Sequence, residues 1–301
     1  MRLNQIRDFI VTVEAGSLRA AARSVGVSQP ALTKSLRQLE NELGVQLLQR
    51  SSRGVSPTRS GHAFLTRARV VQAELRRATE DLADLKGERA GAVAFGVSPS
   101  AAVLFVPEAH VRFRQKYPFA AVRVVEGMLQ GLLPLLRDET LDFAVGQKPP
   151  GALDPAIRHR PLCRARLVVA GRRGHPLRAA HSLRELADAS WLMYSPRGQG
   201  GILERFFSAA GLPGPKVVVH CESYAAALAL LARTDTLGLV VPQLLAQPYA
   251  HGFLQQIEIA ETAPDLPVGL FARANAPLPP AAAAMAAAVT AAARRLARVN
   301  R

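Results

Sequence analysis

Residues 17–40 contain two short helical patterns separated by a glycine turn, and this stretch constrains the fold more than any other. In the first pattern, apolar side chains recur at spacings of three and four residues: Leu18, Ala21, Ala22 and Val25. Gly26 then supplies the backbone freedom that a tight turn requires. A second helix is expected to begin at Ser28, whose hydroxyl can cap free N–H groups, with Pro30 in the first turn, where no N–H is needed. The stretch predicts a helix-turn-helix.

The second helix of this pair has a polar face opposite its packing face. Its packing face is expected to consist of Ala31, Leu32, Leu36 and Leu39. The opposite face carries side chains that can reach base edges and phosphates in a major groove: Gln29, Thr33, Lys34 and Arg37. We expect these four, together with Ser28 and Pro30 at the start of the helix, to contact double-stranded DNA. The alternative is a solvated amphipathic helix pair. The helix start, the turn, the cap and the polar face together favour DNA contact over this alternative.

The flanks of this stretch complete a DNA-binding unit. Before it, apolar residues at helical spacing predict a helix that covers the pair: Leu3, Ile6, Phe9, Ile10 and Val13. After it, residues 50–58 have the composition of a basic hairpin. As a wing beside the DNA backbone, this hairpin would contact phosphates through Arg50, Arg53 and Thr58, which gives affinity without reading sequence.

Residues 61–86 have a heptad pattern of apolar residues. The stripe consists of Phe64, Ala68, Val71, Leu75, Ala78, Leu82 and Leu85. We expect this long helix to bury its stripe against a copy of itself, because a dimer presents two recognition helices to a two-fold DNA site. The alternative is a helix that packs on its own domain.

Beyond residue 90, short apolar strands alternate with helices, which predicts an α/β fold with mostly parallel sheets and helices on both faces. The expected strands are 93–97, 122–125, 141–145, 167–170, 191–194, 217–220, 237–241 and 267–271. The expected helices are 101–116, 129–137, 201–210, 223–232 and 279–299. Two similar α/β units without a long linker suggest paired lobes around a cleft, as in periplasmic binding proteins.

Composition and charge exclude several classes of protein. The chain has 301 residues and a net charge of +15, but residues 1–61 hold only nine basic and four acidic side chains, so the net charge says little about DNA binding.

The N-terminus lacks the apolar core of a secretory signal, which favours the cytoplasm. Residues 281–293 are alanine-rich and soon followed by arginines, which indicates a packed helix rather than a membrane span. Cys163 and Cys221 have no metal-like spacing, so we expect no metal and no cofactor, with a redox sensor as the alternative.

A ligand is expected where strands of the two lobes end, because helix N-termini point free N–H groups into the crevice of such folds. The first lobe offers Ser98, Ser100, Met128, Gln147 and Lys148 at strand ends, and the second lobe offers Ser195, Arg197, Ser223 and Val241. Hydroxyls, helix N-termini and two cations together favour a small organic anion as the effector. The alternative for each serine is a helix cap without a ligand.

An enzyme is the rival class, and the sequence offers little for it. Residues 96–100 lack the second glycine of a nucleophile elbow, no phosphate-binding loop occurs, and the histidines are scattered. We therefore expect no catalytic residues. A solute-binding protein and an architectural DNA-binding protein are two further rival classes.

The chain resembles the LysR-type transcriptional regulators. In the N-terminal part the resemblance rests on Phe9, residues 15–17, 20–22, 27–32, 39–40, 43–44 and Arg50, with Thr33 and Pro57 departing from the usual pattern. In the C-terminal part it rests on Phe113, residues 117–118, 126–127, 136–144, 174–177, 238–242 and 277–281. Within the family, residues 98–101, 137–144 and 221–223 look most like regulators of aromatic sulfonate or carboxylate degradation.

This resemblance implies a domain organisation and a set of partners. It implies a winged helix-turn-helix at residues 1–60, a linker helix at 61–88 and a two-lobed effector domain at 90–301. The first lobe would comprise residues 91–163 and 267–301, and the second lobe residues 164–266. A homodimer or homotetramer is implied, with RNA polymerase as a partner if the protein activates transcription.

Overall fold

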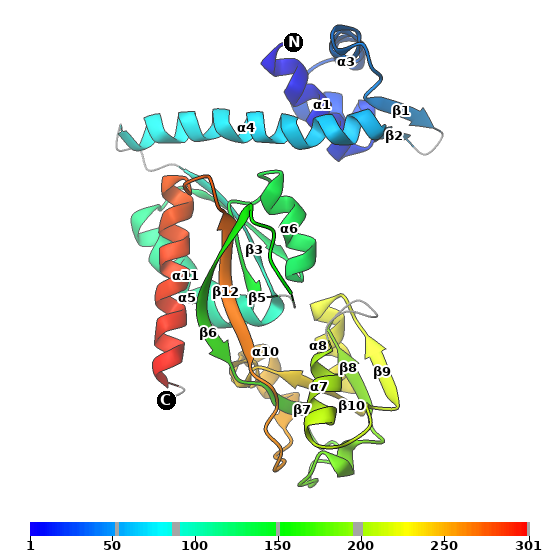
Figure 1. The fold of residues 1–301 in the computed structure, drawn as a ribbon, viewed down its shortest axis with the longest axis vertical. Helices are drawn as coiled ribbons and strands as arrows, with labels where there is room; N and C mark the ends of the chain where they lie inside the picture. The colour runs from blue at the N-terminus through cyan, green and yellow to red at the C-terminus, as the bar shows by residue number, and fades with distance from the viewer. Residues whose placement is uncertain (52–53, 86–90, 149–150, 195–200, 300–301) are drawn as a thin grey trace.

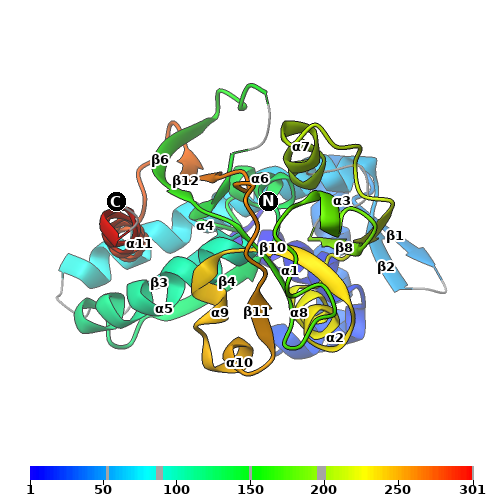
Figure 2. The ribbon, with the colours of Figure 1, turned by 90° about the horizontal axis from the view of Figure 1, so that it is seen from below.

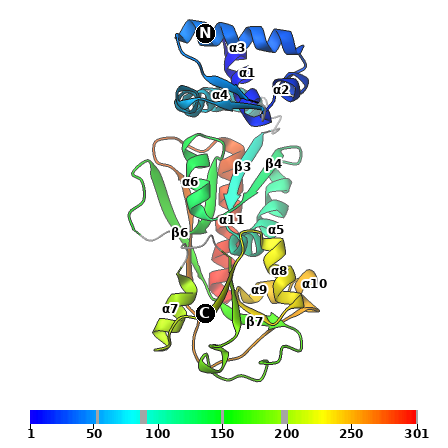
Figure 3. The same ribbon diagram turned by 90° about the vertical axis from the view of Figure 1, so that its right-hand side faces the viewer.

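The computed structural model describes residues 1–51, 54–85, 91–148, 151–194 and 201–299. An N-terminal helical unit, a long helix and two α/β lobes follow one another along the molecule (Figures 1 and 3). Each lobe is built on one five-stranded sheet. This arrangement confirms the predicted fold class.

The N-terminal unit packs three helices and a hairpin around a small apolar core. Its elements are α1 (Leu3–Ala15), α2 (Leu18–Val25), α3 (Gln29–Leu43), β1 (Leu48–Ser51) and β2 (Gly54–Pro57). Phe9, Leu32 and Leu39 are fully buried in this core. Gly26 ends α2 in the left-handed conformation, with φ of 72°, as the expected turn requires. Two predicted packing residues are wrong: Ala31 and Leu3 are exposed, because each lies at the start of its helix, where the first turn projects beyond the core.

The predicted apolar stripe lies on the long helix α4 (Arg59–Leu85), and its two parts have different surroundings. Phe64 and Ala68 pack on the N-terminal core, and the Phe64 ring meets Phe9 edge-to-face at 5.3 Å. This first part therefore follows the alternative, a helix packed on its own domain. Val71, Leu75 and Leu82 are 39%, 43% and 60% exposed, so in the described part of the chain the second part of the stripe is largely open to solvent.

The first lobe holds a sheet whose strands lie in the order β4-β3-β5-β12-β6. The strands are β3 (Ala92–Val97), β4 (Ala121–Glu126), β5 (Phe143–Gln147), β6 (Ile157–Ala165) and β12 (Leu266–Arg273). Helices α5 (Pro99–Lys116) and α11 (Pro280–Val299) share a core on one face, and α6 (Leu129–Arg137) packs in a separate core on the other. β3, β4 and β5 are parallel, whereas β12 runs antiparallel to β5 and β6.

The second lobe holds a sheet in the order β11-β7-β10-β8-β9. Its strands are β7 (Val168–Arg172), β8 (Ser190–Met193), β9 (Val217–His220), β10 (Thr236–Val240) and β11 (Leu254–Gln256). Its helices are α7 (Ile202–Ala209), α8 (Tyr224–Arg233), α9 (Pro242–Leu245) and α10 (Pro248–His251), with a short 3-10 turn at Arg184–Leu186. β8, β9 and β10 pair in parallel, whereas β7 pairs antiparallel with β10 and β11, so both sheets are mixed rather than mostly parallel.

The chain passes between the sheets twice at neighbouring points. β6 and β12 pair antiparallel, with Leu266 opposite Ala165 at their shared end. The chain leaves β6 for β7 through residues 166–167 and returns directly into β12. Among the helices within the described ranges, none combines the length and the hydropathy needed to span a bilayer.

Candidate DNA-binding surface and ligand cavity

Helix α3 lies at the end of the molecule farthest from the second lobe (Figure 1). Gln29, Pro30, Lys34 and Arg37 are exposed there, and Thr33 is half-buried. Gln38 and Asn41 extend the same surface along the helix. Ser28 has a different role, because its Oγ accepts a hydrogen bond from the Ala31 N–H at 3.3 Å and caps α3. The face therefore presents amide, hydroxyl and cationic donors to solvent.

The hairpin β1–β2 projects to one side of the molecule, away from α11 (Figure 2). Strand β2 is held against the turn between α1 and α2, because the Val55 N–H donates to the Gly16 carbonyl at 2.8 Å. Arg50 is exposed on β1, opposite Val55, whereas Arg53 lies outside the described residues. The Thr58 hydroxyl donates to the Gln46 carbonyl at 2.7 Å and accepts from the Gly61 N–H at 3.0 Å. The oxygen of Thr58 therefore caps the start of α4, while its proton is bonded to Gln46 rather than to a DNA phosphate.

A cavity of about 130 Å³ lies between the two lobes. The first lobe lines it with Ser98, Pro99, Ser100, Met128, Leu129 and Gln147. The second lobe and the crossover line it with Leu167, Tyr194, Tyr224, Leu239, Val240, Val241 and Leu266. Pro99, Leu129 and Tyr224 are the first residues of α5, α6 and α8, so three helix N-termini meet at this cavity. Helix N-termini carry unpaired N–H groups and the positive ends of the helix dipoles, which favours a negatively charged group at this cavity.

Ser98 and Ser100 supply hydroxyls at the N-terminus of α5. Ser98 is 6% exposed, and its Oγ lies 3.4 Å from the Oγ of Ser100. The Ser98 side chain makes no cap bond to α5 although Ser98 occupies the cap position. Its backbone is fixed instead, because its N–H donates to the Val145 carbonyl at 2.8 Å. One hydroxyl donates to the other, so the proton of the accepting hydroxyl remains available to a ligand.

Tyr194 and Tyr224 form an aromatic wall in the second lobe. Their rings are perpendicular, with centroids 5.7 Å apart. The Tyr194 hydroxyl donates to Glu126 Oε1 at 3.2 Å and so connects the two lobes. Burial, followed by the charge of Glu126, raises the pKa of Tyr194 to about 12, and burial also raises the pKa of Tyr224. Both phenols therefore stay protonated near neutral pH.

The structure brings together some of the sequence-predicted ligand residues and separates others. Ser98, Ser100, Met128, Gln147 and Val241 line the cavity. Lys148 is exposed and lies near His159, whose pKa is lowered mainly by burial and secondly by this lysine. The Ser223 side chain is exposed, and its Oγ accepts from the Ala226 N–H at 3.3 Å as the cap of α8.

The two remaining predictions, Ser195 and Arg197, lie outside the described residues. Among the lining residues that the structure describes there is no lysine or arginine. Sequence reasoning missed both tyrosines. Their positions could have indicated them, because Tyr194 ends the predicted strand 191–194 and Tyr224 is the second residue of the predicted helix 223–232.

Two arginines of α4 contact the first lobe. Arg69 Nη1 lies 2.5 Å from Asp138 Oδ2, and its Nη2 lies 3.2 Å from Oε1 of Glu14 on α1. Arg76 Nη2 lies 3.1 Å from Oδ1 of Asp142, whose Oδ2 accepts from the Ala94 N–H at 2.8 Å. Sequence reasoning missed this contact.

The described part of the chain contains no cluster of histidine, cysteine and carboxylate side chains suited to a metal ion. Cys163 and Cys221 are free thiols. Burial raises the pKa of Cys163 to about 11, which disfavours the reactive thiolate at neutral pH.

Comparisons with known proteins agree with this geometry. A family model described as the LysR substrate binding domain matches residues 86–294, and one described as bacterial regulatory helix-turn-helix protein, lysR family, matches residues 3–62. The HTH-type transcriptional regulator GalR of Pseudomonas putida is 32% identical over 289 residues, which cover 95% of this chain and 72% of that protein. The SDS degradation transcriptional activation protein of a Pseudomonas species is 30% identical over 290 residues, 94% of each protein. The crystal structure of CbnR, a LysR family transcriptional regulator, matches with a TM-score of 0.72 at 24% identity, over 97% of this chain and 99% of that chain.

Proposed function

The chain belongs to the LysR family of DNA-binding transcriptional regulators, and on this premise we propose that a small aromatic anion in the cavity between its lobes controls it. Membership in this family makes the protein a regulator with an effector-binding domain rather than an enzyme. The chemistry of the effector is the part that we propose.

One observation carries the proposal: the N-termini of α5, α6 and α8 meet at a cavity that also holds the paired hydroxyls of Ser98 and Ser100. A carboxylate or sulfonate accepts several hydrogen bonds at once, and helix N-termini favour negative charge. In the described lining no cation neutralises the ligand, so Ser98, Ser100 and the backbone N–H groups would bind the anionic group.

The size and the walls of the cavity favour a single aromatic ring. Its volume of about 130 Å³ is on the order of an apolar cavity that binds benzene. Leu239 and Leu266 together with the rings of Tyr194 and Tyr224 offer apolar and aromatic contacts. One relative is named for SDS degradation, and SDS is an organic sulfate anion. Its long alkyl chain exceeds this volume, so we favour a compact carboxylate or sulfonate.

Two elements extend from the cavity to α4 and suggest how ligand binding at the cavity affects the DNA-binding unit. α6 begins at the cavity with Leu129, and Asp138 at its end pairs with Arg69. β5 ends at the cavity with Gln147, and Asp142 just before it pairs with Arg76. A ligand that prefers one separation of the lobes would thus change the contact with α4. A ligand with equal affinity for both states would change nothing.

For DNA recognition we propose the α3 residues Gln29, Thr33, Lys34 and Arg37, with Arg50 and Arg53 of the wing beside phosphates. The exposure of Gln29, Lys34 and Arg37 and the position of α3 at the outer end of the molecule support the proposal. We also propose the division into residues 1–60, 61–88 and 90–301, and cytoplasmic action as a homodimer or homotetramer. The uncovered side chains Val71, Leu75 and Leu82 on α4 support self-association.

The test is a thermal-shift titration of the full-length protein with benzoate and 4-toluenesulfonate, with benzyl alcohol as the uncharged control. A ligand that binds only the folded state stabilises it by about 2.7 kcal/mol at a hundred times its dissociation constant. We expect both anions to raise the melting temperature and benzyl alcohol to have little effect.

Ser98→Ala should lower the affinity for the active anion roughly tenfold or more, because it removes a donor to a charged group. Ser182→Ala is the matched control, since that hydroxyl donates to Glu185 outside the cavity. Wild-type affinity in Ser98→Ala and Ser100→Ala would place the effector elsewhere.

A further inference from the structure

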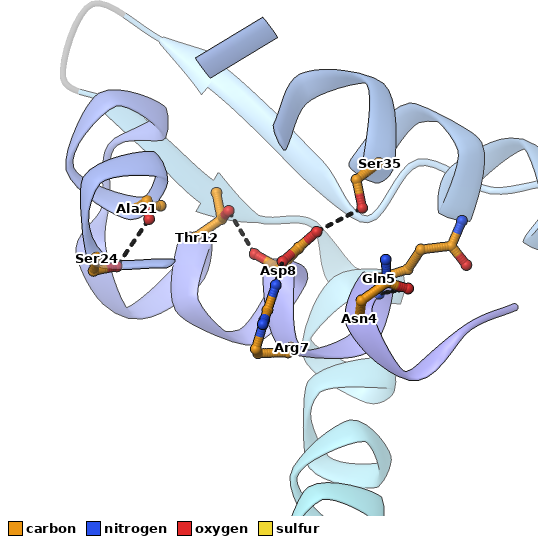
Figure 4. A network of polar contacts seen from close by, with 8 residues as sticks. All are labelled: Asn4, Gln5, Arg7, Asp8, Thr12, Ala21, Ser24 and Ser35. Carbon is orange, nitrogen blue, oxygen red and sulfur yellow. Dashed lines mark hydrogen bonds and ion pairs between the residues drawn. The ribbon is translucent and has the colours of Figure 1, made fainter. Parts of the chain in front are cut away.

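Helix α1 carries a buried polar row beside its apolar face. Gln5, Asp8 and Thr12 are 1%, 4% and 0% exposed, at spacings of three and four residues. A buried charge is costly unless it is paired and hydrogen-bonded, so Asp8 must have partners. Figure 4 shows that it does: Oδ1 accepts from Arg7 Nη2 at 3.0 Å, and Oδ2 accepts from the Ser35 hydroxyl at 2.6 Å. The buried carboxylate of α1 is therefore bonded to α3.

Ser35 occupies a particular place on α3. At 3.6 residues per turn it lies beside the packing row of Leu32, Leu36 and Leu39, on one flank of that row. The leucines hold α3 against the core, but apolar contacts are non-directional and leave rotation about the helix axis weakly specified. A hydrogen bond at the flank opposes that rotation, because it requires both a distance and an angle.

Rotation of α3 matters to the polar face on its other side. A turn of about 20° moves side-chain atoms near the outer radius of a helix by about 2 Å. Binding constellations must be held within about 0.5 Å and 10–20° of their productive geometry. Gln29 and Arg37 would therefore lose their alignment with base edges if α3 turned this far.

We propose that Asp8 is a positioning residue for DNA recognition, which fixes the rotation of α3 through Ser35 and so sets the angle at which the α3 side chains meet the bases. The proposal rests on α3 being the helix that reads DNA, as proposed above. Asp8 itself does not contact DNA in this scheme, since its carboxylate is buried between α1 and α3.

A positioning role differs measurably from a purely structural one. Contacts from long cationic side chains to phosphates adapt to a small rotation and set the salt dependence of binding. Contacts to base edges do not adapt, and they set the preference for one sequence over another. Loss of the bond between Asp8 and Ser35 should therefore reduce sequence preference at an unchanged salt dependence.

The experiment uses the full-length protein and two DNA duplexes. One is the duplex that the wild-type protein enriches from a random pool, and the other is a scrambled duplex of equal length and composition. In Ser35→Ala we expect the ratio of the two affinities to fall about fivefold or more, which corresponds to the loss of one good base contact. Ser35→Thr keeps the hydroxyl and should retain most of the ratio. Asp8→Asn keeps an acceptor oxygen, so we expect a smaller loss than in Ser35→Ala.

Ser24→Ala is the matched control. It is the same chemical change on the neighbouring helix α2, where the hydroxyl donates to the Ala21 carbonyl at 2.8 Å and not to α1 (Figure 4). We expect the wild-type ratio in this variant. Gln29→Ala tests the premise, because it should reduce the ratio if α3 reads DNA.

The outcomes distinguish the positioning role of Asp8 from its premise, that α3 reads the DNA sequence. A wild-type ratio in Ser35→Ala, with a reduced ratio in Gln29→Ala, would overturn the positioning role and leave a bond that serves stability alone. An unchanged ratio in both would overturn the assignment of α3. Equal losses of affinity for both duplexes in Ser35→Ala, with an altered salt slope, would also contradict the proposal.

Discussion

The ion pair between Arg69 and Asp138 joins α4 to the end of α6, and its strength can be worked out from its burial. The N–O distance is 2.5 Å, and the two side chains are only 21% and 14% exposed. Exposed pairs contribute about 0.2–1 kcal/mol, whereas removal of one partner from a buried pair costs about 3–5 kcal/mol. Partial burial and the second contact of Arg69 with Glu14 place the coupling between Arg69 and Asp138 at about 1–2 kcal/mol.

A double-mutant cycle measures this coupling. Arg69→Met, Asp138→Asn and the double variant are unfolded with urea, and the unfolding free energies are followed by circular dichroism. The control cycle uses Lys216 and Asp188, whose N–O distance is also 2.5 Å but whose side chains are 74% and 78% exposed. We expect the control coupling to be below about 0.5 kcal/mol. Equal couplings in both cycles would refute the reasoning, because burial would then make no difference.

The same variants connect the ion pair to control by the effector. If α6 transmits occupancy of the cavity to α4, Arg69→Met should reduce the change in DNA affinity that the active anion causes. Binding of that anion in the absence of DNA should change little, because Arg69 does not line the cavity. An undiminished effect of the anion on DNA binding would show that the signal takes another route.

Three further changes have expected outcomes. Gln29→Ala should cost about 1–3 kcal/mol of discrimination between bases, and an unaltered preference in a binding-site selection would contradict its role. The double variant Val71→Asp with Leu75→Asp places unpaired charges in the expected dimer interface at a cost of several kcal/mol, so light scattering should report smaller particles than for the wild type. Burial lowers the pKa of His159 in the folded state. As pH falls below about 6.5, the unfolded chain therefore binds a proton at this histidine more readily than the folded chain does. The unfolding free energy should therefore decrease in this range, and His159→Gln should weaken the dependence in urea titrations.

The DNA-binding unit could be predicted because its signals are local. Ser28 and Gly26 determine where α3 begins and where α2 ends through bonds that lie within four residues of them. Helix α6 also follows the predicted limits, residues 129–137, since its leucines recur at helical spacing over that segment. Such features depend on short stretches of chain, which a single sequence displays in full.

The sequence does not predict strand β6, because this strand lies at the edge of its sheet. Its outward positions carry Arg158, Arg160 and Arg164, and it contains Pro161. An edge strand needs neither an apolar pattern on both faces nor a donor at every position, so charge and proline are tolerated there. The sequence of β6 therefore has the composition of a loop, although the strand pairs along its length with β12.

The contact between α4 and the first lobe could not be predicted for a different reason. Arg69 and Asp138 are 69 residues apart, and a charged residue on a helix carries no mark of its distant partner. Their pairing requires the two chain segments to be placed in space first. The same holds for Tyr194 and Glu126, whose bond joins the lobes.

These long-range contacts form a physical path between the ligand cavity and α4, which leads to the DNA-binding unit. α6 has nine residues and is therefore about 13 Å long, with the cavity at its first residue and α4 beside its end. The proposed control requires that a ligand which displaces the N-terminus of α6 move the whole helix, so that the displacement reaches Asp138 and its partner Arg69. β5 follows a parallel course from Gln147 to Asp142, which bonds both to Arg76 and to the β3 backbone. Because α6 and β5 pack in one core, a change at the cavity that moved only one of them would strain the contact between them. Both arginine contacts should consequently form or break together, which favours two discrete settings of α4 over a graded response.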